Sequence, residues 1–502
     1  LHSRGGARGP VGDAGFMSAP TTRLSARQLL SMTGGLGAER VAYTELAGRI
    51  RLLIADGRIP VDTQLPSERE LAVLSGRSRT TIAATYQALR DSGHLVSRQG
   101  SGSRAILPHL RDVSRRPNHA VNFAGSIPPP VAGLRELIAE TTAELPDITT
   151  FPGFDLLGND GLRQAIADRY TARGLPTVRN QIIVTTGGQH AIALTAQTLV
   201  ARSDVALVES PTYPHAYEAY HRAGARMVAS PVTTAGWDIP HLIATIQRSR
   251  PVVAYLIPDF HNPTGASMGP EDRARVAAAA RAAGTTLVID EATVDLSIDR
   301  AWDDGPFARH ATGHSGTDGS GIITLGSLSK SIWSGLRVGW IRADETVIRR
   351  LVQARPAGDL GTPPIEQLIA ERVVCELDEL VLDRQRMLRE HRFALHEALR
   401  RRLPQWTMPW PDGGLSMWVQ LDRPGSSALT SICQARGMSL IAGPKFSIDG
   451  SLERFLRIPF TSRVENLDAG IAMLAEAWES LGGGRATGSG AAAGVRQPAS
   501  AL

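Results

Sequence analysis

The sequence of 502 residues contains little cysteine, little lysine and few aromatic residues. Its two cysteines, Cys375 and Cys433, are too few and too isolated for a disulfide framework or a zinc site. No apolar run approaches the roughly 18 residues that cross a bilayer, and the first residues lack the apolar core of a signal peptide. These absences argue against disulfide-rich, zinc-binding and membrane-spanning proteins and favour a protein of the reducing cytoplasm.

Lysine is the most informative of these scarce residues, because Lys330 and Lys445 are the only two in the chain. Arginine supplies the rest of the positive charge, so an amine at position 330 requires a reason that arginine cannot meet. An amine can form a Schiff base, whereas a guanidinium is effectively always protonated and cannot. A surface lysine spared by chance is the alternative, and the flanking sequence Ser327-Leu328-Ser329-Lys330-Ser331 weighs against it.

The overall composition, 42% hydrophobic and 21% charged, is typical of a soluble globular protein. The length predicts about three domains, or one large and one small domain. A net charge of +5 permits nucleic-acid binding without requiring it. Between Tyr43 and Arg104, however, nine arginines stand against six acidic residues, so this short segment holds much of the surplus.

The two ends of the chain are expected to carry no chemistry. Residues 1–40 are predicted to be a partly disordered extension, with Met17 as the functional start. Residues 482–502 are rich in Gly, Ala and Ser, a composition that predicts a disordered tail.

Three short helices are predicted after Tyr43. The first has an apolar stripe and ends before Gly57 and Pro60; the stripe consists of Leu46, Ile50, Leu53 and Ile54. Ser67 and Glu70 have capping-box spacing for a second helix that runs toward Gly76. A third helix begins near Ser78, and its predicted inward residues are Ile82, Tyr86 and Leu89.

A glycine-tipped hairpin from Leu95 to Gly102 follows these helices, and the whole predicts a winged helix-turn-helix. Recognition helices of this motif contact base edges through their amino-terminal residues, and helix amino termini also suit phosphates. Arg79, Thr80 and Thr81 would occupy that position. Periodicity alone leaves a small helical protein-interaction domain open as an alternative.

Residues 41–106 closely resemble the DNA-binding domain of the GntR family. The resemblance rests on Tyr43, Leu65-Pro66-Ser67-Glu68-Arg69, Ser78-Arg79-Thr80-Thr81, Tyr86, Leu89, Gly93, Arg98, Gly100, Ser101 and Gly102. It implies contacts with double-stranded DNA by Ser67, Arg69, Arg79, Thr80, Arg98 and Gly100. Residues 107–122, with Pro108, Pro117 and a basic cluster, are predicted to be a linker.

In the rest of the chain, a series of apolar strands each ends at a polar cluster. The strands and the clusters that follow them are Ile182–Val184 before Thr185–His190, Val205–Val208 before Glu209–Tyr213, Val253–Ile257 before Pro258–Gly265, Thr286–Ile289 before Asp290, and Ile322–Leu325 before Lys330. Helical stretches between them suit parallel crossovers, which predicts an α/β fold with a mainly parallel sheet. Ligands bind such sheets beyond the carboxyl ends of the strands.

These polar clusters meet the needs of one cofactor. Pyridoxal phosphate (pyridoxal 5'-phosphate) requires a lysine, a carboxylate for its ring nitrogen, a partner for its phenolic oxygen and an anion cradle. The order and spacing resemble the fold-type I aminotransferases of class I over residues 123–481. By that resemblance Lys330 forms the Schiff base, Asp290 pairs with the pyridinium, Asn262 bonds the phenolic oxygen and Tyr213 stacks on the ring. The implied phosphate-binding residues are Gly188, Gln189, Ser327, Ser329 and Arg337.

Arg457 lies where this family places the arginine that binds a substrate carboxylate. Its fork of donors suits a planar carboxylate. A surface arginine is the alternative.

The chain departs from the family pattern at two tyrosines. Ala292 and Thr293 occupy the positions where the family usually has a tyrosine for the phenolic oxygen, and we expect Thr293 to replace part of that hydroxyl. Phe151-Pro152-Gly153-Phe154 likewise has phenylalanine where an aminotransferase often has a tyrosine that reaches the partner subunit's phosphate. These departures predict cofactor binding without assured turnover.

The order of the two modules resembles the MocR/GabR group of GntR regulators. This resemblance implies a cytoplasmic homodimeric transcription factor that senses a small amino compound through aldimine exchange at Lys330. An active aminotransferase with an attached DNA-binding module is the main alternative. A DNA-binding protein whose second module is a cofactor-free dimerisation scaffold is the third.

Overall fold

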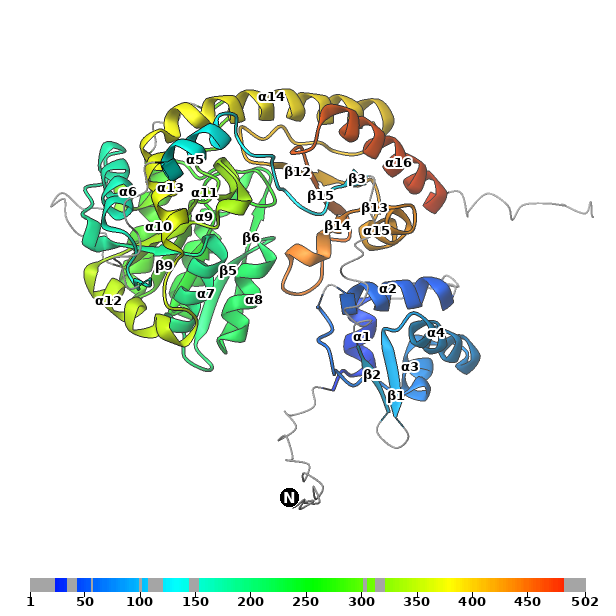
Figure 1. The fold of residues 1–502 in the computed structure, drawn as a ribbon. Coiled ribbons are helices and arrows are strands. Elements are labelled where there is room, and N and C mark those ends of the chain that lie inside the picture. The colour runs from blue at the N-terminus through cyan, green and yellow to red at the C-terminus, as the bar shows by residue number, and fades with distance from the viewer. Residues whose placement is uncertain are drawn as a thin grey trace, which may run out of the picture. The chain divides into compact units, whose positions relative to one another are not determined.

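The computed structural model describes residues 23–33, 43–55, 57–98, 102–106, 121–143, 153–300, 305–311 and 321–482. The chain forms two compact units, which divide between Arg115 and Arg116 (Figure 1). The small unit contains the predicted helices and hairpin, and the large unit contains the predicted α/β module.

The small unit is a winged helix-turn-helix. Its predicted helices are α2 (Tyr43–Ala55), α3 (Glu68–Ser75) and α4 (Arg79–Asp91), and its hairpin consists of the antiparallel strands β1 (Leu95–Arg98) and β2 (Gly102–Ala105). The predicted inward residues are all buried: Leu46, Ile50, Leu53, Ile54, Ile82, Tyr86 and Leu89. The helical periodicity therefore identified the core of this unit.

Side-chain caps fix the starts of α3 and α4. The Ser67 hydroxyl oxygen accepts a hydrogen bond from the backbone N–H of Glu70 at 3.2 Å, and the Ser78 hydroxyl oxygen accepts one from Thr81 N–H at 3.1 Å. The buried Tyr86 hydroxyl donates to the Pro66 carbonyl at 2.6 Å and ties α4 to the segment that precedes α3. Capping of this kind typically stabilises a helix by about 1 kcal/mol.

A further helix of this unit, α1 (Ala26–Met32), was not predicted and lies in the expected extension. A capping box between Ser25 and Gln28 begins it. Ala26 and Leu29 are buried in the same core as α2 to α4. The Ser-x-x-Gln spacing was a visible signal, but seven residues are too few for a clear apolar stripe.

The large unit is built on an eight-stranded sheet in the order β4-β11-β10-β9-β8-β5-β6-β7. Its strands are β4 (Ile182–Thr185), β5 (Val205–Ser210), β6 (Arg226–Thr233), β7 (Gly236–Trp237), β8 (Val253–Leu256), β9 (Thr286–Asp290), β10 (Ile322–Ser327) and β11 (Gly339–Arg342). Strands β10, β9, β8, β5 and β6 pair in parallel, whereas β11 and β7 are antiparallel to their neighbours. The predicted mainly parallel sheet is confirmed.

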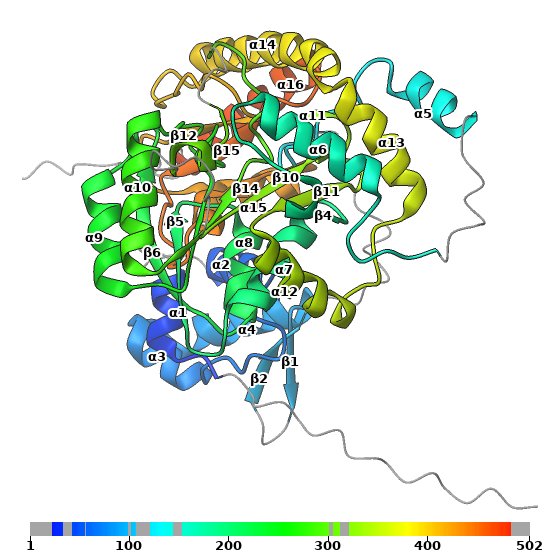
Figure 2. The same ribbon diagram turned by 90° about the vertical axis from the view of Figure 1, so that its left-hand side faces the viewer.

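Helices cover both faces of this sheet (Figure 2). Ile182 and Val184 face a core shared with α5 (Leu134–Ala143), α6 (Asp160–Ala172), α9 (Ile239–Ser249), α10 (Pro270–Ala283) and α13 (Pro364–Cys375). Ile183 between them faces a second core, shared with α7 (Gly188–Leu199), α8 (Pro214–Arg222) and α12 (Glu345–Ala354). Burial on both faces explains why the strands read as continuous apolar runs.

A smaller sheet completes the large unit. It consists of the antiparallel strands β12 (Ser416–Gln420), β15 (Phe455–Pro459) and β14 (Ile441–Ala442), packed with α14 (Leu377–Arg402), α15 (Ser426–Ala435) and α16 (Val464–Gly482). Beside it β3 (Val121–Asn122) pairs with β13 (Met438–Ser439), so the predicted linker extends two residues too far. No helix among the described residues is long and apolar enough to cross a membrane.

Candidate functional site

The predicted cofactor residues lie at or after the carboxyl ends of five strands. Asp290 is the last residue of β9, and α11 (Leu328–Ser331), which carries Lys330, follows β10 directly. Gly188, Tyr213 and Asn262 follow β4, β5 and β8. Because the carboxyl ends of parallel strands share one edge of a sheet, these segments gather at the edge where ligands of such folds bind.

Lys330 is a partly buried amine. Its Nζ donates to the backbone carbonyl of Ser126 at 3.0 Å. Burial, together with the charges of Arg457 and Arg337, lowers the pKa of Lys330 to about 8, and the charge of Asp290 opposes this shift. A neutral amine, the form that can attack a carbonyl carbon, is therefore far more accessible here than at a surface lysine.

Asp290 is a buried carboxylate with two hydrogen-bond donors. The Tyr255 hydroxyl donates to its Oδ2, and the backbone N–H of Ala292 donates to its Oδ1 at 2.9 Å. Burial raises the pKa of Asp290, although both of these hydrogen bonds oppose the rise. A desolvated carboxylate of this kind favours a cationic partner such as a protonated ring nitrogen. Tyr255 was not predicted as a site residue, because its only signal in the sequence was a hydroxyl within an apolar strand.

Arg457 on β15 lies beside Asn262. Its Nη1 donates to Asn262 Oδ1 at 3.5 Å, which leaves the Asn262 amide nitrogen as a donor for an oxygen of a ligand. Nη2 donates to the Ala124 carbonyl, and the guanidinium lies 5.0 Å from the centre of the Phe446 ring. Burial lowers the pKa of Arg457 to about 10.

The Arg457 guanidinium has unused donor capacity. Its buried Nε has no hydrogen-bond partner among the described residues, and no acidic side chain of the described chain forms an ion pair with it. A buried cation without a counter-charge is costly, and a bidentate carboxylate would satisfy it. The donor set therefore fits the carboxylate of a ligand.

The turn between β4 and α7, a candidate anion cradle, depends on glycine. Gly187 has a φ of 80°, and a Cβ there would lie 2.7 Å from Arg337 Nη2. Arg337 Nη2 donates to the Thr186 carbonyl at 3.2 Å, so its guanidinium lies over this turn. Helix α7 starts directly afterwards, and its first backbone N–H groups suit a phosphate.

Two serines complete the cradle. Ser327 Oγ accepts a hydrogen bond from the backbone N–H of Ser329 at 3.2 Å, and an added Cβ on Gly188 would lie 3.4 Å from Ser327 Cβ. The Ser329 hydroxyl is buried and has no partner among the described residues. This orphaned hydroxyl fits an oxygen of a phosphate group.

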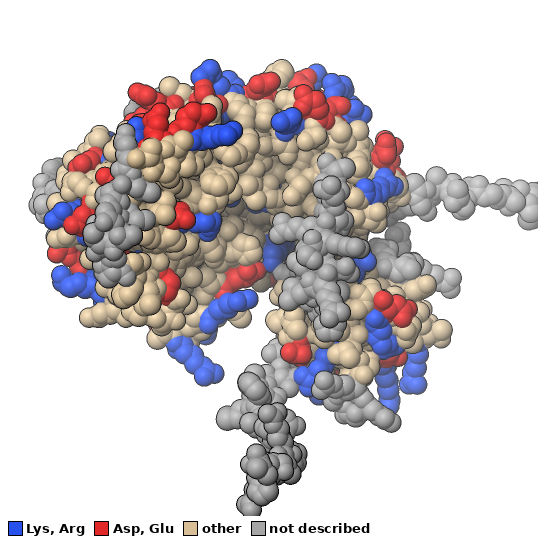
Figure 3. Space-filling model, viewed as in Figure 1, with Lys and Arg blue, Asp and Glu red and all other residues tan. Residues whose placement is uncertain are grey.

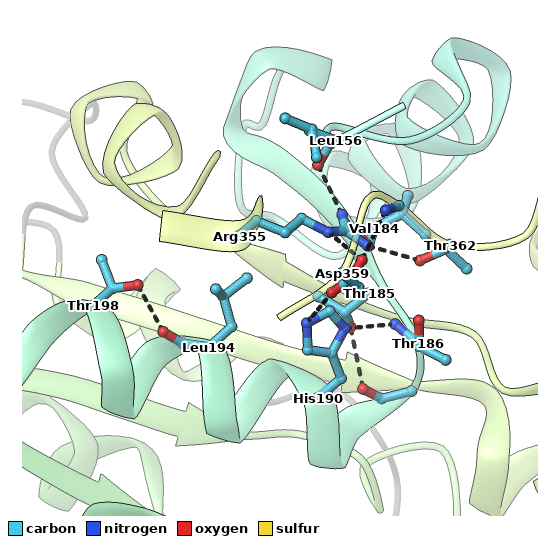
Figure 4. Close-up of polar contacts among 12 residues, drawn as sticks. Leu156, Val184, Thr185, Thr186, His190, Leu194, Thr198, Arg355, Asp359 and Thr362 are labelled. Carbon is cyan, nitrogen blue, oxygen red and sulfur yellow. Dashed lines mark hydrogen bonds and ion pairs between the residues drawn. The ribbon is translucent and has the colours of Figure 1, made fainter. Parts of the chain in front are cut away.

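A network of hydrogen bonds and an ion pair holds the β4–α7 turn in place (Figure 4). Thr186 N–H donates to His190 Nδ1 at 3.0 Å, and His190 Nε2 lies 2.8 Å from Asp359 Oδ2. Arg355, which is buried, donates to Asp359 Oδ1 at 2.9 Å and to the carbonyls of Leu156 and Val184 at 2.7 Å each. This network could not be predicted from the sequence, because its members are far apart in the chain.

A second buried network holds the segment that carries Asn262. Glu209 accepts hydrogen bonds from Trp237 Nε1 at 2.8 Å and from the backbone N–H of Ile257, and its Oε2 lies 3.1 Å from His261 Nε2. His261 Nδ1 lies 2.9 Å from the Thr264 hydroxyl. Glu209 and His261 are almost fully buried. The network links the ends of β5 and β8 and orients the residue next to His261.

Several of the side chains named in the sequence analysis have hydrogen-bond or ion-pair partners within the protein. Thr293, expected to replace part of the missing tyrosine hydroxyl, donates through its Oγ1 to the Asp259 carbonyl at 2.9 Å. The Gln189 side chain donates to the His215 carbonyl at 3.3 Å, toward α8. Phe151 lies outside the described residues, and Phe154 is exposed. Lys445 forms an ion pair with Glu218 at 2.9 Å.

The predicted DNA-contacting residues of the small unit are exposed where they are described. Ser67 and Arg69 lie at the start of α3, and Arg79 and Thr80 form the start of α4. Arg98 ends β1, but its side chain and Gly100 lie outside the described residues. No cluster of three or more His, Cys, Asp or Glu side chains in the described chain could hold a metal ion.

Comparison with known proteins decides the family. The family model for aminotransferases of class I and II matches residues 130–474. The chain belongs to the class I and II aminotransferase family. A second model, for bacterial regulatory proteins of the gntR family, matches residues 42–104. The chain thus joins a gntR DNA-binding domain to an aminotransferase-like domain, the composition predicted for the MocR type.

Similar proteins include both regulators and enzymes. The uncharacterized HTH-type transcriptional regulator YdcR of Escherichia coli is 27% identical and covers 83% of this chain and 94% of its own. MocR of Rhizobium meliloti, a probable rhizopine catabolism regulatory protein, is 28% identical over 60% of this chain and 64% of its own. The structure of LysN, an α-aminoadipate aminotransferase of Thermus thermophilus, superposes with a TM-score of 0.66 at 27% identity, over 74% of this chain and 95% of LysN.

Proposed function

We propose that this protein is a MocR-type transcriptional regulator that binds pyridoxal phosphate at Lys330 and senses an amino compound there. The observation that carries the proposal is Lys330 itself, a partly buried amine with a lowered pKa, near the charges of Asp290 and Arg457, in a chain that also has a gntR domain. The similar proteins that are named as regulators, YdcR and MocR, support the same assignment.

The residues present fit the cofactor. Asp290 would hold the ring nitrogen, the Asn262 amide nitrogen the phenolic oxygen, and the α7 start with Ser329 and Arg337 the phosphate. Tyr213 lies close enough to Asp290 and Arg457 that burial and the Asp290 charge raise its pKa to about 12, and we assign its ring to the cofactor's face. When bound, the cofactor supplies an aldehyde carbon with which one amine can replace another.

Arg457 sets the chemical class of the effector. Its unused donors favour an amino compound that also carries a carboxylate. Such an effector would take the place of the Lys330 amine on the cofactor. If the effector binds one conformation of the protein more tightly than another, its binding shifts the equilibrium between the two conformations. We propose that this shift changes DNA binding in a homodimer of the chain, which suits repeated half-sites.

An active aminotransferase with a DNA-binding domain is the second candidate. The closeness of Lys330 to Asp290 and Arg457, and the contact of Arg457 with Asn262, favour it, as does the likeness to LysN. Against efficient turnover stands the absence of the tyrosine that usually serves the phenolic oxygen, since Ala292 and Thr293 occupy its positions and the Thr293 hydroxyl donates to the Asp259 carbonyl. Losing a hydrogen bond to a charged group costs roughly 1.5 to 3 kcal/mol. Sustained product formation from amino-acid donors and keto-acid acceptors would favour the enzyme.

The two lysines allow a clean test of the cofactor assignment. The full chain is loaded with pyridoxal phosphate, reduced with borohydride and mapped by peptide mass spectrometry. We expect visible absorbance and an adduct on Lys330 in the parent, loss of both in Lys330→Ala, and retention of both in the matched control Lys445→Ala. A colourless parent, or an adduct on Lys445 alone, would refute the proposal.

A further inference from the structure

The small unit extends beyond the segment that the gntR model matches. Residues 23–33 precede that match and add α1 together with a strand-like residue, Arg23. Arg23 forms a parallel bridge to Gln64, and Gln64 forms an antiparallel bridge to Arg104. The backbone N–H of Leu24 donates to the Gln64 carbonyl at 2.9 Å. Arg23, Gln64 and Arg104 therefore form a row of residues that lie side by side across neighbouring strands at the wing.

The side chains of this row face solvent. Directly opposed residues of neighbouring strands point to the same face of a sheet, and the residues next to them point to the other face. The other face is the core, since Leu65 and Ala105 are 2% and 0% exposed. Arg23 is exposed, and Gln64 and Arg104 are half-buried, as an outer face requires.

This row lies next to the predicted DNA-contacting residues. A Cβ on Gly102 would lie 2.7 Å from Gln64 Nε2, so the Gln64 side chain reaches over Gly102, which pairs with Arg98 in the hairpin. In the other direction along the chain, Gln64 leads through Leu65 and Pro66 to Ser67 at the start of α3. The wing and the α3 start thus meet at the strand that Arg23 joins.

The charge of the row is positive. Arg104 Nη1 donates to the backbone carbonyl of Asp62 at 3.4 Å, and the two arginines flank the neutral Gln64. The exposed acidic residue Asp62 precedes Gln64 by two positions and lies on the side away from the hairpin tip. Arginine side chains of the small unit gather on the side where the β1–β2 hairpin lies (Figure 3). Such a surface attracts phosphate groups.

We propose that Arg23 binds a DNA phosphate and that residues 23–33 contribute to the DNA-binding surface. The inference rests on DNA binding by the gntR domain and adds a contact that this domain, as matched, does not contain. Phosphate contacts position a protein on DNA without reading its sequence. The contribution of Arg23 is therefore the same on every duplex.

The test measures how the affinity of the full chain for DNA depends on salt. Two duplexes serve as probes, one enriched by repeated selection on the parent protein and one of mixed sequence, and binding is followed by fluorescence anisotropy. In Arg23→Ala we expect weaker binding to both duplexes and a slope of log affinity against log salt that is smaller by about 0.9. Arg23→Lys should restore much of the slope.

Arg51→Ala is the matched control, because Arg51 lies on α2, outside both the row and the starts of α3 and α4. It removes the same charge and should leave the slope unchanged. An unaltered thermal unfolding curve of Arg23→Ala excludes a folding defect at this exposed position. Equal slopes for Arg23→Ala and Arg51→Ala would overturn the inference. A parent that binds neither duplex would instead refute the proposed DNA-binding function.

Discussion

The two units place their functional side chains in opposite environments. Arg69 and Arg79 of the small unit are exposed, whereas Asp290 and Arg457 of the large unit are only 9% and 6% exposed. In water a single charge contributes little, so DNA binding must sum several phosphate contacts and must weaken with salt. Away from water, burial shifts the pKa of a charged group, as it does for Lys330 and Arg457. A buried charge also shifts the pKa of its neighbours, as Arg457 does for Lys330.

The difference has a consequence for mutagenesis. Breaking a buried charge pair typically costs about 3 to 5 kcal/mol, because the remaining charge is left without a partner. Removing an exposed charge changes affinity by much less and leaves the fold intact. Substitutions in the large unit should therefore give large changes in ligand binding, and substitutions in the small unit should give smaller, salt-dependent ones.

The largest effect is expected for Asp290→Asn. The substitution keeps the shape of the side chain but removes the buried negative charge that would pair with the pyridinium. By the cost of a broken buried pair, about 3 to 5 kcal/mol, the dissociation constant for pyridoxal phosphate should rise more than about a hundredfold. A spectroscopic titration of the full chain measures it.

Asp272→Asn is the control for this prediction, since Asp272 is a half-buried residue of α10 that forms an ion pair with Arg275 in the same helix. Its cofactor affinity should equal that of the parent. Parent-like affinity in Asp290→Asn would show that the buried carboxylate does not hold the ring nitrogen.

The next effect is a pH dependence of cofactor attachment. Only the neutral Lys330 amine attacks an aldehyde, and its pKa is lowered from 10.5 to about 8. The rate of attachment should therefore rise about tenfold per pH unit below that value and level off above it. Stopped-flow absorbance over a pH series measures the rate, with free lysine as the reference for the cofactor's own ionisation. An inflection near 10.5 would contradict the environment described for Lys330.

The smallest effect is expected in the small unit. Arg79→Ala should weaken binding to the selected duplex by about 1 to 3 kcal/mol if Arg79 reads a base edge, and should leave the cofactor spectrum unchanged. Arg90→Ala removes the same charge from the other end of α4, where Arg90 pairs with Glu68, and should have less effect. Equal losses in the two variants would show that α4 contributes charge alone and does not read the sequence.

Local signals were sufficient where the structure is local. Ser67 and Ser78 predicted the starts of α3 and α4, and apolar spacing predicted the buried Ile82 and Leu89. The strand ends at Asp290 and Ser327 could also be located, because an apolar run followed by a polar cluster marks where a buried strand reaches the ligand edge.

Contacts between distant residues could not be predicted. The hydroxyl of Tyr255 reaches Asp290, and His190 reaches Asp359, only because the sheet and its helices bring them together. The commitment of the Thr293 proton to the Asp259 carbonyl likewise depends on how two loops pack. Helix α1 was missed because its stability comes from burying Ala26 and Leu29 against another segment.

The sequence by itself determined the order of the two modules, the family of each and the residue types that pyridoxal phosphate requires, because capping, periodicity and motif spacing are properties of neighbouring residues. Only the tertiary structure decided which charges are buried together, which hydroxyls are already committed and which arginines share a surface. Burial and hydrogen bonding act through space, so a pKa near 8 for Lys330 and an orphaned hydroxyl on Ser329 exist only once the chain is folded.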